Sequence, residues 1–174
     1  MFQKQNDMEI VLELLKGKRH LRGLAKAIGI PLTNVKRSVD SLIEGNVLDA
    51  QRVGKNRILS LKKSLESREY VLSAEHYKAL KTLDMYPKLA PIIEDAFEAC
   101  RGMIILFGSH ANLRAKRDSD IDLYCLSGKV RGANVKNGEF KPNSLLAKEI
   151  IKNHVIFRGV EEFYERTGFF EEGR

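Results

Sequence analysis

The chain has 174 residues, of which 43% are hydrophobic, and a formal net charge of +7 from 30 Lys and Arg against 23 Asp and Glu. This length allows one sizeable core or two small domains. No apolar run approaches the roughly 20 residues of a membrane span, and the first residues lack a signal-peptide pattern. The sequence therefore predicts a cytoplasmic protein without a membrane partner. Cys100 and Cys125 lie in apolar segments without metal-ligand spacing, which predicts buried free thiols.

The positive charge is concentrated in the first third of the chain. Residues 1–68 contain 14 Lys and Arg against 7 Asp and Glu, whereas residues 69–174 contain 16 of each. A small basic domain favours nucleic acid as a partner. We therefore expect two domains, over residues 1–68 and 69–174, with a helical connector at the start of the second.

The basic third has the pattern of three helices followed by a hairpin. Apolar periodicity predicts helices over residues 8–15 and 21–28, and Pro31 opens a third that ends at Gly45. Strands are expected over residues 47–52 and 57–61, around a basic tip. In the third helix the apolar and polar residues fall on opposite sides.

Residues 7–63 resemble a winged helix-turn-helix domain of prokaryotic transcription regulators. The resemblance implies binding of double-stranded DNA, with the third helix in the major groove and the hairpin meeting the backbone. The implied DNA-binding residues are Thr33, Asn34, Lys36, Arg37, Lys55, Asn56 and Arg57. The alternative is a packing or dimerisation module with a solvated polar face. A homodimer is also among the expected partners.

The middle of the chain leads to a short apolar strand. A helix is expected over residues 69–83 and another from Pro91. Residues 103–107 are apolar and β-prone, as in a strand buried on both faces. Gly108 then allows a positive φ and a close approach of phosphate to the backbone, and Ser109 is expected to cap a short helix that continues to Leu113.

Two aspartates follow Ser109 after ten intervening residues. Residues 119–124 alternate as a strand, which places Asp120 and Asp122 on one face and the apolar residues on the other. Paired carboxylates suit magnesium, which keeps substrate phosphates among its ligands. The two segments together predict a site for a metal-bound nucleoside triphosphate.

Residues 108–123 resemble the signature of polymerase-β-like nucleotidyltransferases, particularly the minimal ones of prokaryotes. The resemblance implies that Gly108 and Ser109 hold the triphosphate and that Asp120 and Asp122 hold magnesium or manganese. The family usually has glycine where Leu113 stands, and here a leucine is expected to sit in the short helix and pack. Active relatives also have a third carboxylate on a later strand.

The candidate for that third carboxylate is Glu139. It is the only acid between Asp122 and Glu149, and it follows Asn137-Gly138, a strong hairpin signal. A solvated turn residue is the competing interpretation. Lys116 and Arg117 are the candidate cations for the triphosphate. A helix over 145–152, a strand over 155–157 and a helix over 161–166 are expected to complete the scaffold.

The predicted fold class is α/β (α+β): an N-terminal winged helix-turn-helix followed by a small mixed-sheet nucleotidyltransferase fold. The first functional hypothesis is magnesium-dependent transfer of a nucleotide from a nucleoside triphosphate to a hydroxyl of a protein or nucleic acid. The resemblance adds an antitoxin-like role with a HEPN-type toxin as partner. The alternative is a DNA-binding transcriptional regulator whose degenerate nucleotidyltransferase domain senses nucleotide or binds a partner.

Overall fold

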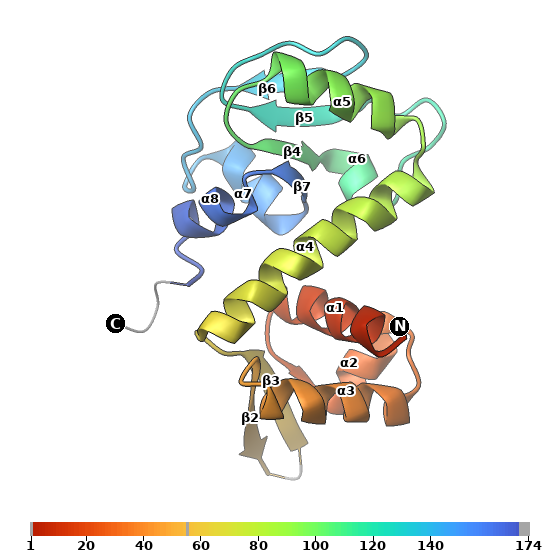
Figure 1. Cartoon of the computed structure of the whole chain (residues 1–174), viewed down its shortest axis with the longest axis vertical. Helices are drawn as coiled ribbons and strands as arrows, with labels where there is room; N and C mark the ends of the chain where they lie inside the picture. Colours follow the sequence, from red (N-terminus) through yellow and green to blue (C-terminus); the bar gives the residue numbers. More distant parts are fainter. Residues whose placement is uncertain (1, 55, 171–174) are drawn as a thin grey trace. The chain divides into compact units, whose positions relative to one another are not determined.

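The computed structural model describes residues 2–54 and 56–170 (Figure 1). The chain forms two compact units that meet between Ala74 and Glu75, inside helix α4 (Leu65–Met85). The boundary predicted after residue 68 lies earlier in the same helix.

The N-terminal unit is a winged helix-turn-helix, as predicted. Its helices are α1 (Phe2–Leu15), α2 (Leu21–Ile28) and α3 (Leu32–Glu44). Gly29 has a φ of 67° directly after α2, and Pro31 precedes α3, so these two residues delimit the turn. Strands β2 (Leu48–Val53) and β3 (Asn56–Leu61) form the expected hairpin, and the short β1 (Arg19–His20) completes an antiparallel sheet in the order β1-β3-β2.

The apolar stripes of the three helices meet in the core of this unit. The fully buried apolar side chains there are Ile10, Val11, Leu24, Val35, Val39, Leu42, Val47, Leu48 and Leu59. Their burial leaves the polar side of α3 facing away from the core, which is the side that a DNA-reading helix exposes.

The C-terminal unit contains a four-stranded mixed sheet. Its strands are β4 (Ile104–Phe107), β5 (Asp122–Cys125), β6 (Asn134–Asn137) and β7 (Val155–Arg158), in the order β6-β5-β4-β7. The pairs of β4 with β5 and β7 are antiparallel, whereas β5 and β6 are parallel. The mixed sheet predicted from the sequence is thus confirmed.

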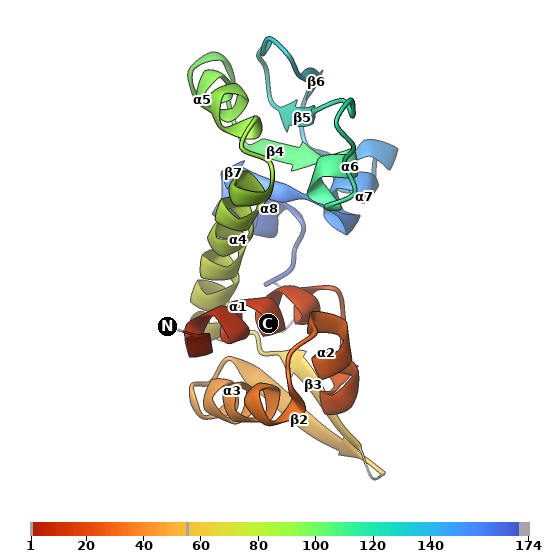
Figure 2. The ribbon, with the colours of Figure 1, turned by 90° about the vertical axis from the view of Figure 1, so that its right-hand side faces the viewer.

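Helices cover this sheet on both faces (Figures 1 and 2). Helix α5 (Leu89–Ala99) covers one face, where Ile93 packs in a cluster with Ile104 and Leu106. Helices α7 (Leu145–Lys152) and α8 (Val160–Arg166) lie toward the other face. All four residues of β4 are buried, as expected for a strand covered on both sides.

The predicted first residue is correct for one helix of this unit and differs by two residues for another. Helix α7 has the predicted bounds, and the Ser144 hydroxyl accepts a hydrogen bond from the Ala147 amide at 3.2 Å. Helix α5 was expected to start at Pro91 but begins at Leu89, so Pro91 occupies its first turn, where proline needs no amide partner.

A buried polar cluster joins α4 to α8 and to the loop before β7. Glu75 is 1% exposed, and its Oε1 accepts a hydrogen bond from the Tyr164 hydroxyl at 2.7 Å. The same oxygen lies 3.3 Å from Nε2 of His154, whose Nδ1 lies 2.9 Å from the Ile150 carbonyl oxygen. A buried carboxylate needs such partners, because an unpaired one would be costly.

Both cysteines are buried free thiols, which confirms the prediction. Burial raises the pKa of the Cys125 thiol to about 12, and the neighbouring Cys100 adds to the rise. Across the described residues, none of the helices combines the length and the apolar content that a membrane crossing requires.

Candidate functional site

The close approach of Asp122 to Gly108 defines the site. Phe107, the last residue of β4, pairs with Asp122, the first residue of β5, so Gly108 emerges beside the aspartate. Gly108 has a φ of +71°, and a Cβ built on it would lie 2.7 Å from Oδ2 of Asp122. Only glycine satisfies both conditions, because other residues rarely adopt this φ and their Cβ would clash. The positive φ expected for Gly108 is confirmed.

The two aspartates flank the start of β5. Ile121 and Leu123 are buried, as the alternation predicted, while Asp122 is partly exposed and Asp120 is exposed. The strand is shorter than predicted, because it begins at Asp122 and leaves Asp120 in the preceding loop. Its partner β4 ends at Phe107, opposite Asp122, so the ladder does not extend to Asp120.

Asn134 is a site residue that the sequence analysis missed. It is the first residue of β6 and the parallel partner of Asp122, and its Nδ2 donates a hydrogen bond of 2.9 Å to Oδ1 of Asp122. The backbone N–H of Asn134 also donates to the Ile121 carbonyl oxygen at 2.8 Å. An amide side chain, rather than an acid, therefore stands beside Asp122 on the neighbouring strand.

Glu139 does not join the aspartates. Because β5 and β6 run parallel, Asp122 and Asn134 mark the same end of the sheet, and Glu139 follows the opposite end of β6. The hairpin signal at Asn137-Gly138 does not produce a hairpin, because β6 ends at Asn137. The Gly138 carbonyl accepts a hydrogen bond from the Tyr124 hydroxyl at 2.6 Å. The geometry agrees with the solvated-turn interpretation of Glu139, which is exposed.

The turn after β4 also differs from expectation. Helix α6 (Gly108–Ala111) has Phe107 at its cap position without a side-chain cap, so Ser109 lies inside the helix and does not cap it. Leu113 was expected to pack in the helix but lies beyond it, 43% exposed, with a φ of +56°. The left-handed backbone explains why glycine suits this position, because leucine is strained there.

His110 connects α6 to the aspartate loop. The residue is fully buried, its Nδ1 lies 3.1 Å from the Asp120 carbonyl oxygen, and its ring meets Tyr86 edge-on at 5.1 Å. Burial lowers the pKa of His110 below its ordinary value of 6.5, and the charge of Lys88 lowers it further. Both effects favour the neutral form of the imidazole.

A pocket of about 520 Å³ opens beside Asp120. The residues that line it are Lys88, Asp118, Ser119, Asp120, Ile121, Gly132, Ala133 and Asn134. Lys88 brings a cation to this pocket, and its Nζ donates to the Arg117 carbonyl oxygen at 3.1 Å. Lys116 and Arg117, the cations predicted from the sequence, are exposed and do not line the pocket. Lys88 is distant in sequence and gave no local signal.

The donor set fits magnesium delivered with a nucleotide. Within residues 2–54 and 56–170, no three His, Cys, Asp or Glu side chains gather as a complete metal site. Magnesium, however, is commonly held by one or two carboxylates together with substrate phosphates and water. Asp120 and Asp122 supply two carboxylate ligands with hard oxygen donors. The remaining ligands would come from the triphosphate and from water.

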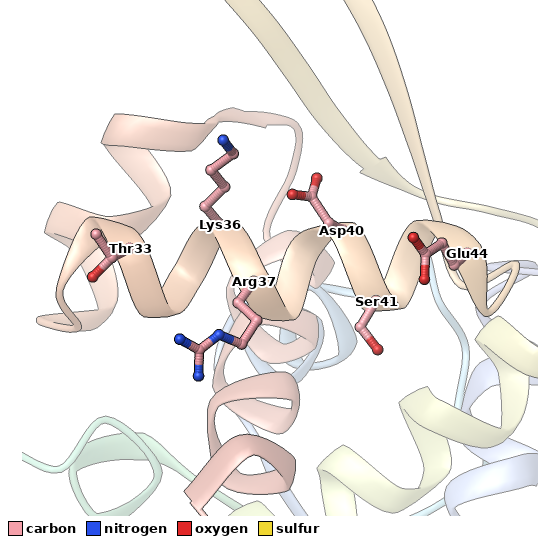
Figure 3. Close-up of a pocket in the computed structure, with 6 residues that line it drawn as sticks. All are labelled: Thr33, Lys36, Arg37, Asp40, Ser41 and Glu44. Atoms are coloured by element: carbon pink, nitrogen blue, oxygen red, sulfur yellow. The ribbon is translucent and has the colours of Figure 1, made fainter.

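The exposed side of α3 is the second candidate surface (Figure 3). A shallow pocket there is lined by Thr33, Lys36, Arg37, Asp40, Ser41 and Glu44. Lys36 and Arg37 point away from the helix in different directions, and both acids lie in its C-terminal half. The positive charge of α3 is thus concentrated toward its N-terminal half.

The remaining predicted DNA contacts lie on α3 and at the hairpin. Asn34 and Asn56 are exposed, and Lys55 lies outside the described residues. Arg57 is engaged within the unit, because its guanidinium lies 2.8 Å from Oδ1 of Asp40. The structure therefore places the described members of this set on α3 and β3, and it pairs one of them, Arg57, with an acid.

A family model matches part of the C-terminal unit. Residues 87–170 match the model described as a nucleotidyltransferase domain. The match includes Gly108, Asp120, Asp122 and Asn134. A comparison with curated proteins finds no match.

Two solved structures are similar to the chain. One is the adhesin competence repressor of Streptococcus pyogenes, with 19% identity, a TM-score of 0.41, and coverage of 49% of this chain and 64% of that one. The other is HmgR of Pseudomonas aeruginosa, with 18% identity, a TM-score of 0.30, and coverage of 78% of this chain and 52% of that one. The chain thus spans less than two thirds of either.

Proposed function

We propose that the C-terminal unit binds a metal-bound nucleoside triphosphate at Gly108, Ser109, Asp120 and Asp122, and transfers its nucleotidyl group to an acceptor hydroxyl. The observation that carries this proposal is the packing of the Asp122 carboxylate against Gly108, where a Cβ would fill the space. A carboxylate held against an open turn lets a metal-bound phosphate approach both the acid and the backbone.

Each residue has a definite part in this proposal. Asp120 and Asp122 would hold magnesium or manganese, which would offset the phosphate charge and orient the triphosphate for in-line attack. Lys88 would add a positive charge from the pocket beside Asp120. The acceptor oxygen bonds to the α-phosphorus as pyrophosphate leaves, and the hydroxyl proton passes to solvent, because the Asn134 amide is no proton acceptor.

The test is transfer of label from α-labelled ATP with Mg²⁺ or Mn²⁺ to an acceptor in host extract. We expect the wild-type protein to label an acceptor and the Asp120→Asn, Asp122→Asn double variant to lose the label. Asp95→Asn, a charge-matched change at an exposed position of α5, is the control and should label normally. Label that survives the double substitution contradicts the assignment.

The acceptor that we propose is a protein, specifically a HEPN-type toxin partner in an antitoxin-like role. The proposal depends on the likeness of residues 108–123 to the minimal nucleotidyltransferases of prokaryotes. Identification of the labelled acceptor by mass spectrometry tests it, and label on a nucleic acid would contradict it.

A second candidate function follows from the α3 surface: binding of double-stranded DNA by the N-terminal unit. The exposed Lys36 and Arg37 favour it, and the absence of a third acid beside Asp122 among the described residues favours regulation over rapid turnover. In this alternative the C-terminal unit binds the nucleotide as a regulatory ligand and does not use it as a substrate. Arg57 is expected to contribute less than Lys36 because Asp40 already pairs with it.

The salt dependence of DNA affinity tests this second function. Replacing Lys36 and Arg37 with alanine should weaken binding and reduce the slope of log K against log salt by about 0.9 for each lost phosphate contact. Lys4→Ala, an exposed lysine of α1, serves as the control. An unchanged slope in the double variant would show that Lys36 and Arg37 do not contact DNA phosphates and are only solvated.

A further inference from the structure

We propose that His110 is a positioning residue that holds the backbone of Asp120 against the turn containing Gly108 and Ser109. This inference rests on the proposed metal and nucleotide site. It holds that the His110 side chain fixes the position of Asp120 relative to the turn at Gly108. His110 is fully buried in α6, whereas Asp120 is exposed in the loop before β5. A hydrogen bond between Nδ1 and the Asp120 carbonyl oxygen, at 3.1 Å, links the two segments.

The hydrogen-bonding partners determine where the His110 proton lies. A carbonyl oxygen accepts hydrogen bonds and does not donate, so Nδ1 must carry the proton. Nε2 is buried and has no partner among the described residues. A proton there would leave a buried N–H unsatisfied, which is unfavourable, so the neutral Nδ1–H tautomer is the one that the site accommodates.

The ring is held in place by its surroundings. The Tyr86 ring meets the His110 ring edge-on, with 5.1 Å between the ring centroids. Ala111, the next residue after His110, belongs to the apolar cluster that packs against α5. Because the imidazole is held in one rotamer, it cannot move with the loop. Its hydrogen bond therefore restrains the position of the Asp120 carbonyl group. Asp120 needs such a link, since it precedes the strand ladder that begins at Asp122.

Positioning explains the geometry better than two other roles. As a metal ligand, Nε2 would need acidic neighbours, yet no cluster of three His, Cys, Asp or Glu suited to a metal occurs in the described part of the chain. As mere packing, the residue would need no polar atom, and an apolar side chain would avoid burying an unpartnered nitrogen. The hydrogen bond to Asp120 is what requires histidine.

Two substitutions separate the hydrogen bond from the volume of the ring. His110→Asn retains an N–H donor near the position of Nδ1, whereas His110→Leu fills the site without one. His76→Leu, at an exposed position of α4, is the matched control. Mn²⁺ binding in the presence of a non-hydrolysable ATP analogue is followed by electron paramagnetic resonance, and thermal unfolding checks that each variant is folded.

We expect His110→Leu to weaken Mn²⁺ binding about threefold to tenfold, the value of one hydrogen bond. His110→Asn and the His76→Leu control should remain within about twofold of the wild type. Wild-type affinity in His110→Leu overturns the proposal. In the wild-type protein, long-range ¹H–¹⁵N correlation should find Nδ1 protonated, and a proton on Nε2 also overturns it.

The tautomer measurement separates this inference from the proposed function. If the wild-type protein binds no Mn²⁺, the proposed metal site fails. The positioning role then depends on the tautomer and on the Asp120 amide signal, which must shift in His110→Leu and return in His110→Asn. An Asp120 signal unaffected by the leucine overturns the positioning role as well.

Discussion

Asn134 donates a hydrogen bond of 2.9 Å from Nδ2 to Oδ1 of Asp122, across the parallel pair of strands that forms one edge of the mixed sheet. The pair fixes the orientation of the Asp122 carboxylate, because its other oxygen faces Gly108. A neutral amide thus stands beside one of the two acids proposed to hold metal.

Asn134→Asp should increase the affinity for divalent metal while destabilising the metal-free protein. Two carboxylates at hydrogen-bond distance repel each other until a cation or a proton neutralises them. We expect Mn²⁺ affinity to rise about tenfold and the melting temperature without metal to fall, with recovery when Mn²⁺ is added. Asn143→Asp, at an exposed position before α7, should change neither quantity. Equal Mn²⁺ affinity in wild type and Asn134→Asp would remove Asn134 from the site.

Lys88→Met should weaken binding of a nucleoside triphosphate more than binding of the monophosphate. The reason is that Lys88 lines the pocket beside Asp120, and the longer phosphate chain carries more charge for it to offset. We expect about a tenfold loss for the triphosphate, measured by calorimetry. Lys116→Met is the comparison, because Lys116 is exposed and does not line that pocket. A larger loss in Lys116→Met would reverse the assignment of the cation.

Leu113→Gly should stabilise the protein. Leu113 has a φ of +56° and is 43% exposed, so glycine relieves backbone strain and sacrifices little burial. The strain is about 1 to 2 kcal/mol, and the greater freedom of glycine in the unfolded chain offsets part of it, leaving a gain of roughly 0.5 to 1 kcal/mol. Urea unfolding measures it. Leu126→Gly, a similarly exposed leucine without positive φ, should instead destabilise.

The buried cluster around Glu75 predicts a loss of stability in acid. Burial alone would raise the pKa of Glu75, but the hydrogen bond from His154, the charges of Lys78 and His154, and the Tyr164 hydroxyl lower it from 4.5 to about 2. The folded state therefore favours the charged form. This contribution, about 3 kcal/mol, is complete above pH 4.5 and is lost as the pH falls toward 2.

Glu75→Gln tests this linkage. The variant should be less stable at pH 7, and its stability should change less than that of the wild type between pH 5 and pH 2. Glu98→Gln, at an exposed position of α5, should retain the wild-type dependence. Chemical unfolding followed at several pH values provides the comparison, and parallel curves for wild type and Glu75→Gln would exclude Glu75 as the source.

Much of the fold was predictable because its signals are local. Gly29 and Pro31 delimit the turn before α3, Ser144 caps α7, and the apolar residues 104–107 form a fully buried strand. Gly108, likewise, was correctly expected at positive φ. Each of these features depends on the conformation of a few neighbouring residues.

The errors occurred where distant segments determine the structure. Strand β6 contains a single apolar residue, Val135, so its parallel pairing with β5 left no periodic signal in the sequence. Asn134 became a site residue through that pairing, and Lys88 through the approach of α5 to the aspartate loop. Contacts across 12 or more residues are not encoded in local patterns.

The central claim is that Asp120 and Asp122 bind a metal-bound nucleoside triphosphate. The most direct measurement is the equilibrium binding of ATP to the purified full chain, with and without Mn²⁺, for the wild type, Asp122→Asn and the exposed-site control Asp95→Asn. We predict Mn²⁺-dependent binding to the wild type and the control, and a loss of at least tenfold in Asp122→Asn, since we propose that the carboxylate packed against Gly108 holds the metal. Equal binding to all three proteins, or binding independent of Mn²⁺, would contradict it.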